Sequence, residues 1–170
     1  VFNAWNITTG NSATKVAVID EGVDLVHPDL AANMLGGYDG TGLGSGGAPS
    51  GDDAHGTNCA GIIAAVGNNS LGVAGVSYTS KIVPVRIAYG SGSSWVTSNA
   101  WIGTSIDWAW NQGDADVLSN SWGGGSSSTL INDAIGRATT LGRGGLGSPV
   151  IFAAGNDNGP VSYPATLTNV

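Results

Sequence analysis

The 170-residue chain has little charge, and positive charge is the scarcest. Five Lys and Arg stand against twelve Asp and Glu, which gives a net charge of −7. A protein with this balance lacks the basic stripe that neutralises nucleic-acid phosphates or an anionic lipid surface. We therefore expect neither nucleic acid nor a membrane as its main partner.

Cysteine and long apolar runs are also scarce. Cys59 is the single cysteine, so no disulfide can form within the chain. No apolar run reaches the roughly 18 residues that a membrane-spanning helix needs. The sequence starts with Val and lacks a basic-then-apolar leader, which suits a segment whose targeting sequence has been removed.

Short apolar runs alternate with segments of helical periodicity. The runs are typical of strands buried on both faces of a sheet, and they span residues 15–19, 82–87, 117–119 and 150–154. Apolar residues at three-to-four spacing predict helices over residues 55–66, 98–112 and 130–141. This alternation predicts one α/β domain over residues 1–170, with a mostly parallel sheet between helical layers.

Glycine is abundant, with 29 residues. Most of it falls in four clusters, which we interpret as surface loops: residues 36–51, 90–92, 123–125 and 142–147. Within the first predicted helix, the small residues Ala60 and Gly61 are expected to allow close packing on the sheet.

Polar residues with chemical capability follow two of the strands and open one helix. Asp20 directly follows the first strand and precedes Gly22, where we expect a sharp turn. His55 opens the first helix, and Asn156 follows the strand at 150–154. Ligands of parallel sheets bind at the carboxyl ends of the strands, which favours a site here. Ordinary caps and turn residues are the alternative for each of them.

Four motifs, DEGVDLVHPDL, HGTNCAG, SNSWGGG and AAGN, resemble the subtilase family of serine proteases in their order and spacing. The resemblance implies a three-layer, subtilisin-like α/β fold and serine endopeptidase activity. It implies that His55 takes a proton from a nucleophilic Ser, and that Asp20 orients His55 and stabilises its protonated form. Asn156 would stabilise the oxyanion. Peptide or protein substrates, a propeptide, and a secreted or periplasmic location are further implications.

The nucleophilic Ser is not expected within these 170 residues. In the family it lies in a GTSMA-like motif well downstream of the oxyanion Asn, whereas the one GTS here, at residues 103–105, precedes Asn156. We expect Ser105 to be an ordinary residue on a helix surface. The chain would then be the first part of a longer protease, incomplete at its C-terminal side and inactive by itself. The alternative is an inactive relative that binds peptides.

The resemblance also implies a substrate cleft. The segment that pairs with an extended substrate would be Ser121, Trp122 and Gly123, and the facing wall of the S1 pocket would be Ala153, Ala154 and Gly155. Ordinary sheet packing is the alternative for both segments. Glu21 stands where kexin-like enzymes carry an acid that attracts a basic side chain at P2, the second substrate residue before the cleaved bond. A solvated carboxylate is the alternative for Glu21.

Asp29 and the following loop resemble the calcium site of the family. The ligands would be the Asp29 carboxylate, the Asn69 amide oxygen and the main-chain carbonyls of Leu71 and Val73, all hard oxygen donors. The alternative is an Asp that caps a turn, with the loop closed by hydrogen bonds. Cys59, one turn after His55, resembles the Cys of thiol-containing subtilases, and we expect a core residue rather than a catalytic one.

A nucleotide-binding α/β domain is the alternative from a different class. Such a domain carries a glycine motif between its first strand and the next helix. Here that place holds DEGVDLVHPDL, an acidic turn that would repel phosphate.

Overall fold

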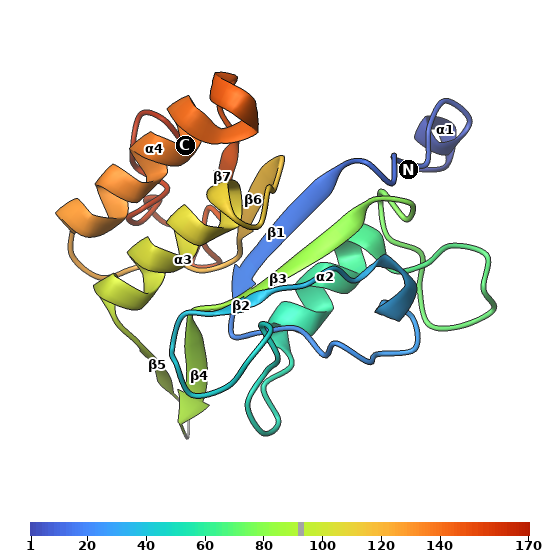
Figure 1. The fold of residues 1–170 in the computed structure, drawn as a ribbon, viewed down its shortest axis with the longest axis horizontal. Coiled ribbons are helices and arrows are strands. Elements are labelled where there is room, and N and C mark those ends of the chain that lie inside the picture. The colour runs from blue at the N-terminus through green and yellow to red at the C-terminus, as the bar shows by residue number, and fades with distance from the viewer. Residues whose placement is uncertain (92–93) are drawn as a thin grey trace.

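Five strands form one parallel sheet in the computed structural model, which describes residues 1–91 and 94–170 (Figure 1). Their order across the sheet is β2-β3-β1-β6-β7. In chain order the strands are β1 (Lys15–Asp20), β2 (Tyr38–Asp39), β3 (Lys81–Arg86), β6 (Val117–Asn120) and β7 (Val150–Phe152). The four predicted strands are confirmed, with ends shifted by one or two residues.

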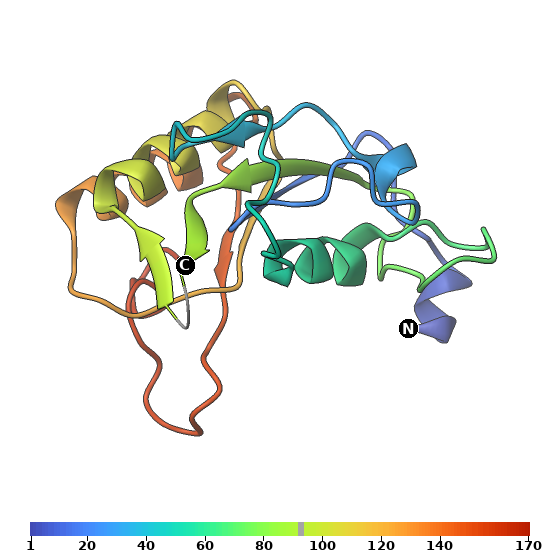
Figure 2. The ribbon, with the colours of Figure 1, turned by 90° about the horizontal axis from the view of Figure 1, so that it is seen from below.

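Apolar cores lie on both faces of the sheet, which explains the continuous apolar runs. In β1, Ala17 and Ile19 pack toward α3 (Asn99–Asn111) and α4 (Thr129–Gly145), whereas Val18 packs toward α2 (His55–Ala64). Figure 2 shows α2 on one side of the sheet and the α3–α4 pair on the other. The predicted three-layer α/β fold is therefore confirmed.

The helix ends differ in part from the prediction. Ser98 caps α3, because its Oγ accepts the Trp101 amide N–H at 3.1 Å. At the end of α4, Gly142 and the two residues after it have non-helical backbone angles. The expected close-packing role of Gly61 is wrong, because none of the described atoms of another segment would lie within 4 Å of a Cβ at that position.

Several short elements were not predicted. They are α1 (Phe2–Trp5), a 3-10 turn (Ala31–Asn33), the edge strand β2, and an antiparallel hairpin of β4 (Ala88–Ser91) and β5 (Ser94–Thr97). The hairpin falls where a glycine loop at residues 90–92 was expected, and residue 92 itself lies outside the described part. These elements have two to four residues each, too few for a periodic pattern.

Ser105 corrects another expectation. Its side chain is buried rather than on the surface of α3, and its Oγ has no hydrogen-bond partner among the described residues. It faces Gly40, where an added Cβ would collide with the Ser105 hydroxyl. A buried hydroxyl on this face is not available to a substrate.

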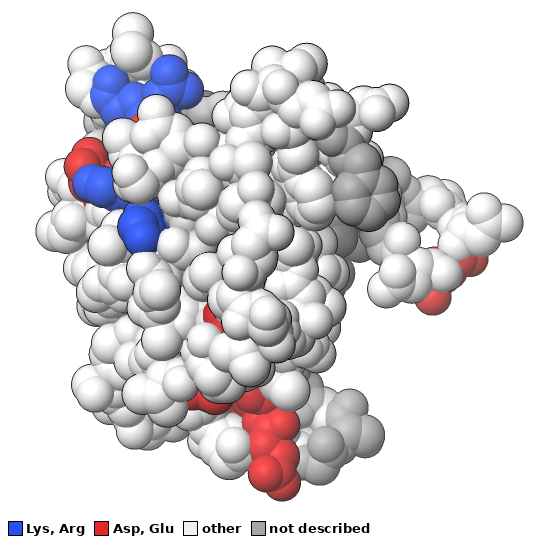
Figure 3. Space-filling view, turned by 90° about the vertical axis from the view of Figure 1, so that its right-hand side faces the viewer, with Lys and Arg blue, Asp and Glu red and all other residues white. Residues whose placement is uncertain are grey.

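The charged residues are unevenly spread over the surface. On the face drawn in Figure 3, basic side chains gather toward one end, whereas acidic side chains lie beside them, at the opposite end and on a protruding part, with no continuous basic stripe over the described part of that face. Within the described residues, no helix combines the length and apolar character needed to cross a bilayer.

Candidate active site

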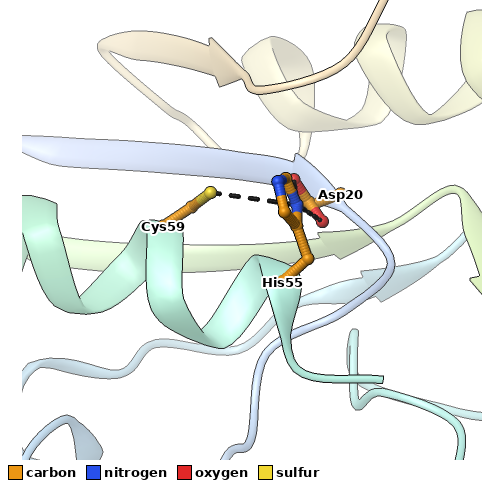
Figure 4. A group of neighbouring side chains, drawn as sticks. All are labelled: Asp20, His55 and Cys59. Carbon is orange, nitrogen blue, oxygen red and sulfur yellow. Dashed lines mark hydrogen bonds and ion pairs between the residues drawn. The ribbon is translucent and has the colours of Figure 1, made fainter. Parts of the chain in front are cut away.

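Asp20 and His55 form a close pair at the carboxyl end of β1. The Nδ1 atom of His55 lies 2.9 Å from Oδ1 and 3.0 Å from Oδ2 of Asp20 (Figure 4). A carboxylate can only accept at these positions, so Nδ1 carries the hydrogen and Nε2 keeps a free lone pair. Asp20 is buried, whereas the His55 side chain is half exposed. The predicted pair is thus brought together with the exposed ring as its accessible member.

Two glycines allow this approach. Gly22 has φ +103°, a left-handed conformation that glycine adopts freely, and it turns the chain sharply just after Asp20, as predicted. Gly56, next to His55, lies so close to β1 that an added Cβ would be 2.3 Å from the Gly22 carbonyl oxygen and 3.0 Å from the Asp20 Cβ. Sequence reasoning missed Gly56, although it lies inside the HGT motif.

Burial dominates the electrostatics of Asp20. Burial raises the pKa of this carboxyl, while its hydrogen bonds to the His55 ring and the Glu21 amide N–H oppose the rise. The carboxylate form is held by these two partners rather than by water. Such a group is suited to stabilising a positive charge that forms on His55 during proton transfer.

Cys59 lies one helical turn beyond His55, with its Sγ 3.9 Å from Nδ1 of the ring. It is partly buried rather than a core residue, which corrects the expectation in part. Burial raises the pKa of the thiol, so little thiolate, the nucleophilic form, exists at neutral pH.

We therefore expect Cys59 to react slowly with alkylating reagents. Iodoacetamide should modify Cys59 more slowly at pH 8 than it modifies an unstructured cysteine peptide, and the rate should rise at higher pH. Mass spectrometry of timed samples measures this rate. Modification of Cys59 as fast as that of the peptide at pH 8 would contradict the raised pKa of the thiol.

A hollow of about 220 Å³ lies beside the segment that follows β6. Both sides predicted for the S1 pocket contribute to its lining. The lining residues are Ser121, Trp122, Gly123, Ala153, Gly155, Asn156, Asp157 and Ser162, of which the last two were not predicted. Ala154 does not line it. Asn156 is exposed at this hollow.

The segment at residues 121–123 leaves the sheet, because β6 ends at Asn120. Among the described residues, none forms a main-chain hydrogen bond with this segment. The Trp122 indole anchors it by donating to the Ile19 carbonyl oxygen at 2.9 Å and by packing edge-on against Phe152. Extended backbone of this kind is able to pair with an added strand.

Glu21 is buried beside the Asp20–His55 pair. The residue is 6% exposed, with Oε1 accepting the His55 main-chain N–H at 2.7 Å and Oε2 accepting the Trp95 indole N–H at 2.6 Å. Both oxygens are thus used inside the protein, so the solvated-carboxylate alternative does not describe Glu21, while its contact to a basic P2 side chain stays a prediction. Sequence reasoning missed Trp95, which lies in the unpredicted hairpin.

Asp29 closes the loop at residues 69–73, away from the Asp20–His55 pair. Its Oδ1 accepts the Asn69 amide at 2.6 Å, and its Oδ2 accepts the Val73 main-chain N–H at 2.8 Å. The Asn69 Oδ1 accepts the Leu71 main-chain N–H at 3.0 Å. The four residues predicted as calcium ligands are thus adjacent, within a loop closed by hydrogen bonds.

Comparison with known proteins agrees with this geometry. The profile of the subtilase family, Peptidase_S8, matches residues 11–170. Thermitase of Thermoactinomyces vulgaris is 40% identical over 167 residues, which cover 98% of this chain and 56% of thermitase. Subtilisin Savinase of Lederbergia lenta is 40% identical over 171 residues, with the same two coverages.

Solved structures show the same likeness. Sphericase superposes with a TM-score of 0.80 at 28% identity over 95% of this chain and 53% of its own. A protease from Pseudoalteromonas arctica superposes with a TM-score of 0.76 at 36% identity, covering 91% of this chain and 53% of its own. The chain spans about half the length of these relatives. The nucleotide-binding alternative is thereby set aside, and the chain belongs to the subtilase family of serine proteases.

Proposed function

We propose that the full-length protein is a serine endopeptidase in which Asp20 and His55 act with a Ser located beyond residue 170. The observation that supports this most strongly is the Asp20–His55 pair, with 2.9 Å between Oδ1 and Nδ1. A buried carboxylate that fixes the Nδ1–H tautomer leaves Nε2 to act as general base. The single GTS motif is not a substitute nucleophile, because Ser105 is buried.

The remaining cleft residues have roles in the same proposal. His55 takes the Ser proton during attack and returns it to the leaving amine, and Asp20 stabilises the imidazolium between these steps. Asn156, exposed at the hollow beside residues 121–123, donates its amide N–H to the oxyanion. The main chain of Ser121, Trp122 and Gly123 binds the extended substrate, and Ala153, Ala154 and Gly155 belong to the facing segment, with Ala153 and Gly155 at the hollow itself.

Peptide hydrolysis by the full-length protein tests this function. We expect cleavage of an unfolded protein such as reduced casein, and complete inhibition by a serine-directed sulfonyl fluoride. Inhibition by a thiol reagent with no effect of the sulfonyl fluoride would contradict a serine mechanism. Tight binding of casein without cleavage would support instead the alternative of an inactive peptide-binding relative.

Secretion is part of the proposal. One relative, 39% identical over 201 residues, is named "Extracellular protease" of Xanthomonas campestris. This name supports the same location for the present chain. We propose a secreted or periplasmic enzyme, with peptide or protein substrates and its own propeptide as partners.

Calcium is proposed as a structural ion at the loop that Asp29 closes. The donor chemistry fits in part, because the buried Asp29 carboxylate lies against the loop that carries the Asn69 amide and the main chain of Leu71 and Val73. The Asn69 nitrogen donates to Asp29 and its Oδ1 accepts the Leu71 main-chain N–H, so binding of the ion through Oδ1 would require the side chain to exchange both hydrogen bonds. Asp29 and Asn69 would hold the ion through side chains, and Leu71 and Val73 through their carbonyls.

Removal of the Asp29 charge tests the calcium proposal. Millimolar Ca²⁺ is expected to raise the melting temperature of the full-length protein by about 5 °C or more relative to chelator, because an ion that binds the folded state stabilises it by mass action. Asp29→Asn should abolish this shift. Asp52→Asn, at an exposed carboxylate, is the matched control. An equal calcium shift in Asp29→Asn would place the ion elsewhere.

A further inference from the structure

Glu21 connects both members of the Asp20–His55 pair to the β4–β5 hairpin. Its main-chain N–H donates to Asp20 Oδ1 at 2.8 Å, and its carboxylate accepts the His55 main-chain N–H at 2.7 Å. The other carboxylate oxygen accepts the Trp95 indole N–H at 2.6 Å. One residue thus holds the proposed catalytic Asp, the proposed general base and a large aromatic side chain in a fixed relation.

The contact to His55 also caps α2. The N-cap residue Ala54 has no side chain able to accept a hydrogen bond, so an amide at the helix N-terminus would otherwise lack a partner. The Glu21 carboxylate supplies that acceptor from the end of β1, with the charge that a helix N-terminus favours. The direction in which α2 presents His55 therefore depends on Glu21.

Trp95 stands beside the catalytic ring. Its ring centroid is 6.3 Å from that of His55, with the two planes at 88°, an edge-on contact. Trp95 is 36% exposed, so one part of the indole packs on His55 and another faces outward. The bond to Glu21 fixes the indole in this orientation.

A second hollow, of about 390 Å³, opens between this indole and the proposed substrate-binding segment. It is lined by His55, Trp95, Ser121, Trp122 and Gly123, and none of these described residues carries a carboxylate. It shares residues 121–123 with the proposed S1 hollow and lies on the His55 side of them. A substrate paired with that segment would place its P2 side chain here.

We propose that Trp95 is a specificity-determining residue that restricts P2 to small, uncharged side chains, and that Glu21 is the positioning residue that holds it there. This inference rests on the proposed function. Because the described residues that line the hollow offer an indole and no carboxylate, selection at P2 is by size rather than by attraction of a basic side chain.

A substrate series varied only at P2 tests the proposal in the full-length protein. We expect kcat/KM to be higher for Ala than for Phe or Arg at P2. Trp95→Ala should raise kcat/KM for the Phe substrate relative to the Ala substrate by roughly 10-fold to 100-fold, the range over which pocket size discriminates side chains. Trp95→Phe, which keeps a ring but loses the indole N–H, should give a smaller change.

Glu21→Gln tests the positioning role separately. It keeps the side-chain volume and one acceptor, but it cannot accept from both the His55 amide and the indole as a carboxylate does. We expect kcat for the Ala substrate to fall about tenfold with little change in KM, since misplacement of the base slows the chemical step. The P2 preference should relax in the same direction as in Trp95→Phe.

The matched control is another indole bonded to a carboxylate, outside the hollow. The Trp110 indole donates to Asp107 Oδ1 at 3.3 Å within α3. Trp110→Phe is expected to leave the P2 preference unchanged. A comparable change of the P2 preference in Trp110→Phe would mean that the effect comes from a general loosening of the fold.

Two results would overturn the proposal. One is an unchanged Phe-to-Ala ratio in Trp95→Ala, and the other is a preference for Arg at P2 that Glu21→Gln removes. Calorimetric binding of uncleaved peptides with the same P2 series gives the ranking without turnover. If no peptide is cleaved but the ranking still depends on Trp95, the proposed peptidase function fails while the inference stands.

Discussion

His55→Ala in the full-length protein is expected to lower kcat by about 10⁶-fold, with KM little changed. The ring is the proposed general base, and without it no group accepts the Ser proton or protonates the leaving amine. The magnitude is taken from loss of the corresponding histidine in subtilisin, a member of the same family. Steady-state kinetics on a chromogenic peptide measure it.

His27→Ala is the matched control, because His27 is the other histidine of the chain and its Nδ1 accepts the Asp29 main-chain N–H at 3.2 Å. It is expected to retain kcat within a fewfold. Circular dichroism of both variants checks that they are folded. Activity near the wild-type level in a folded His55→Ala protein would remove His55 from the mechanism.

Asp20→Asn is expected to lower kcat by about 10⁴-fold and to increase stability at alkaline pH. An amide neither fixes the required His55 tautomer nor stabilises the imidazolium, which accounts for the loss of rate. The expected gain in stability has a separate cause, which is that the Asp20 carboxyl is buried and burial disfavours its charged form.

The pH dependence of that gain follows from the direction of the shift. Burial raises the pKa of Asp20 above its ordinary value of 3.8, so the folded state binds this proton more tightly than the unfolded state. Such a group contributes stability below pH 3.8, and the contribution is lost as the pH rises through the folded-state pKa. The melting temperature of Asp20→Asn minus that of the wild type should therefore be larger at pH 8 than at pH 4.

Thermal unfolding at both pH values checks this expectation. Asp133→Asn, at an exposed carboxylate on α4, is the control and should show the same difference at both. A melting temperature that falls most at pH 8 in Asp20→Asn would mean that the His55 contact outweighs the cost of burial.

The sequence predicted the central strands well, for a physical reason. Strands such as β1 and β3 are buried on both faces and therefore read as unbroken apolar runs. The edge strand β2 has two residues, and the β4 and β5 strands have four residues each of mixed apolar and polar type, so neither leaves a pattern. The buried face of Ser105 was missed because a small hydroxyl at a packed helix position reads as polar surface.

The site was predictable where family motifs identify residues that lie together in space. Asp20 and His55 lie 35 positions apart, and their contact was expected from the family resemblance rather than from spacing. The partners of Glu21 were not predictable, because Trp95 lies 74 positions away in an unpredicted hairpin. A carboxylate next to a catalytic Asp reads as exposed unless the tertiary fold that buries it is known.

Active-site labelling of the full-length protein tests the central claim most directly. The protein is treated with a fluorophosphonate, which reacts with activated serine hydroxyls, and the modified peptide is identified by mass spectrometry. We predict one modified Ser, located beyond residue 170, whose labelling is lost in His55→Ala and kept in His27→Ala. Absence of labelling in the active wild-type protein, or labelling that does not depend on His55, would contradict the account.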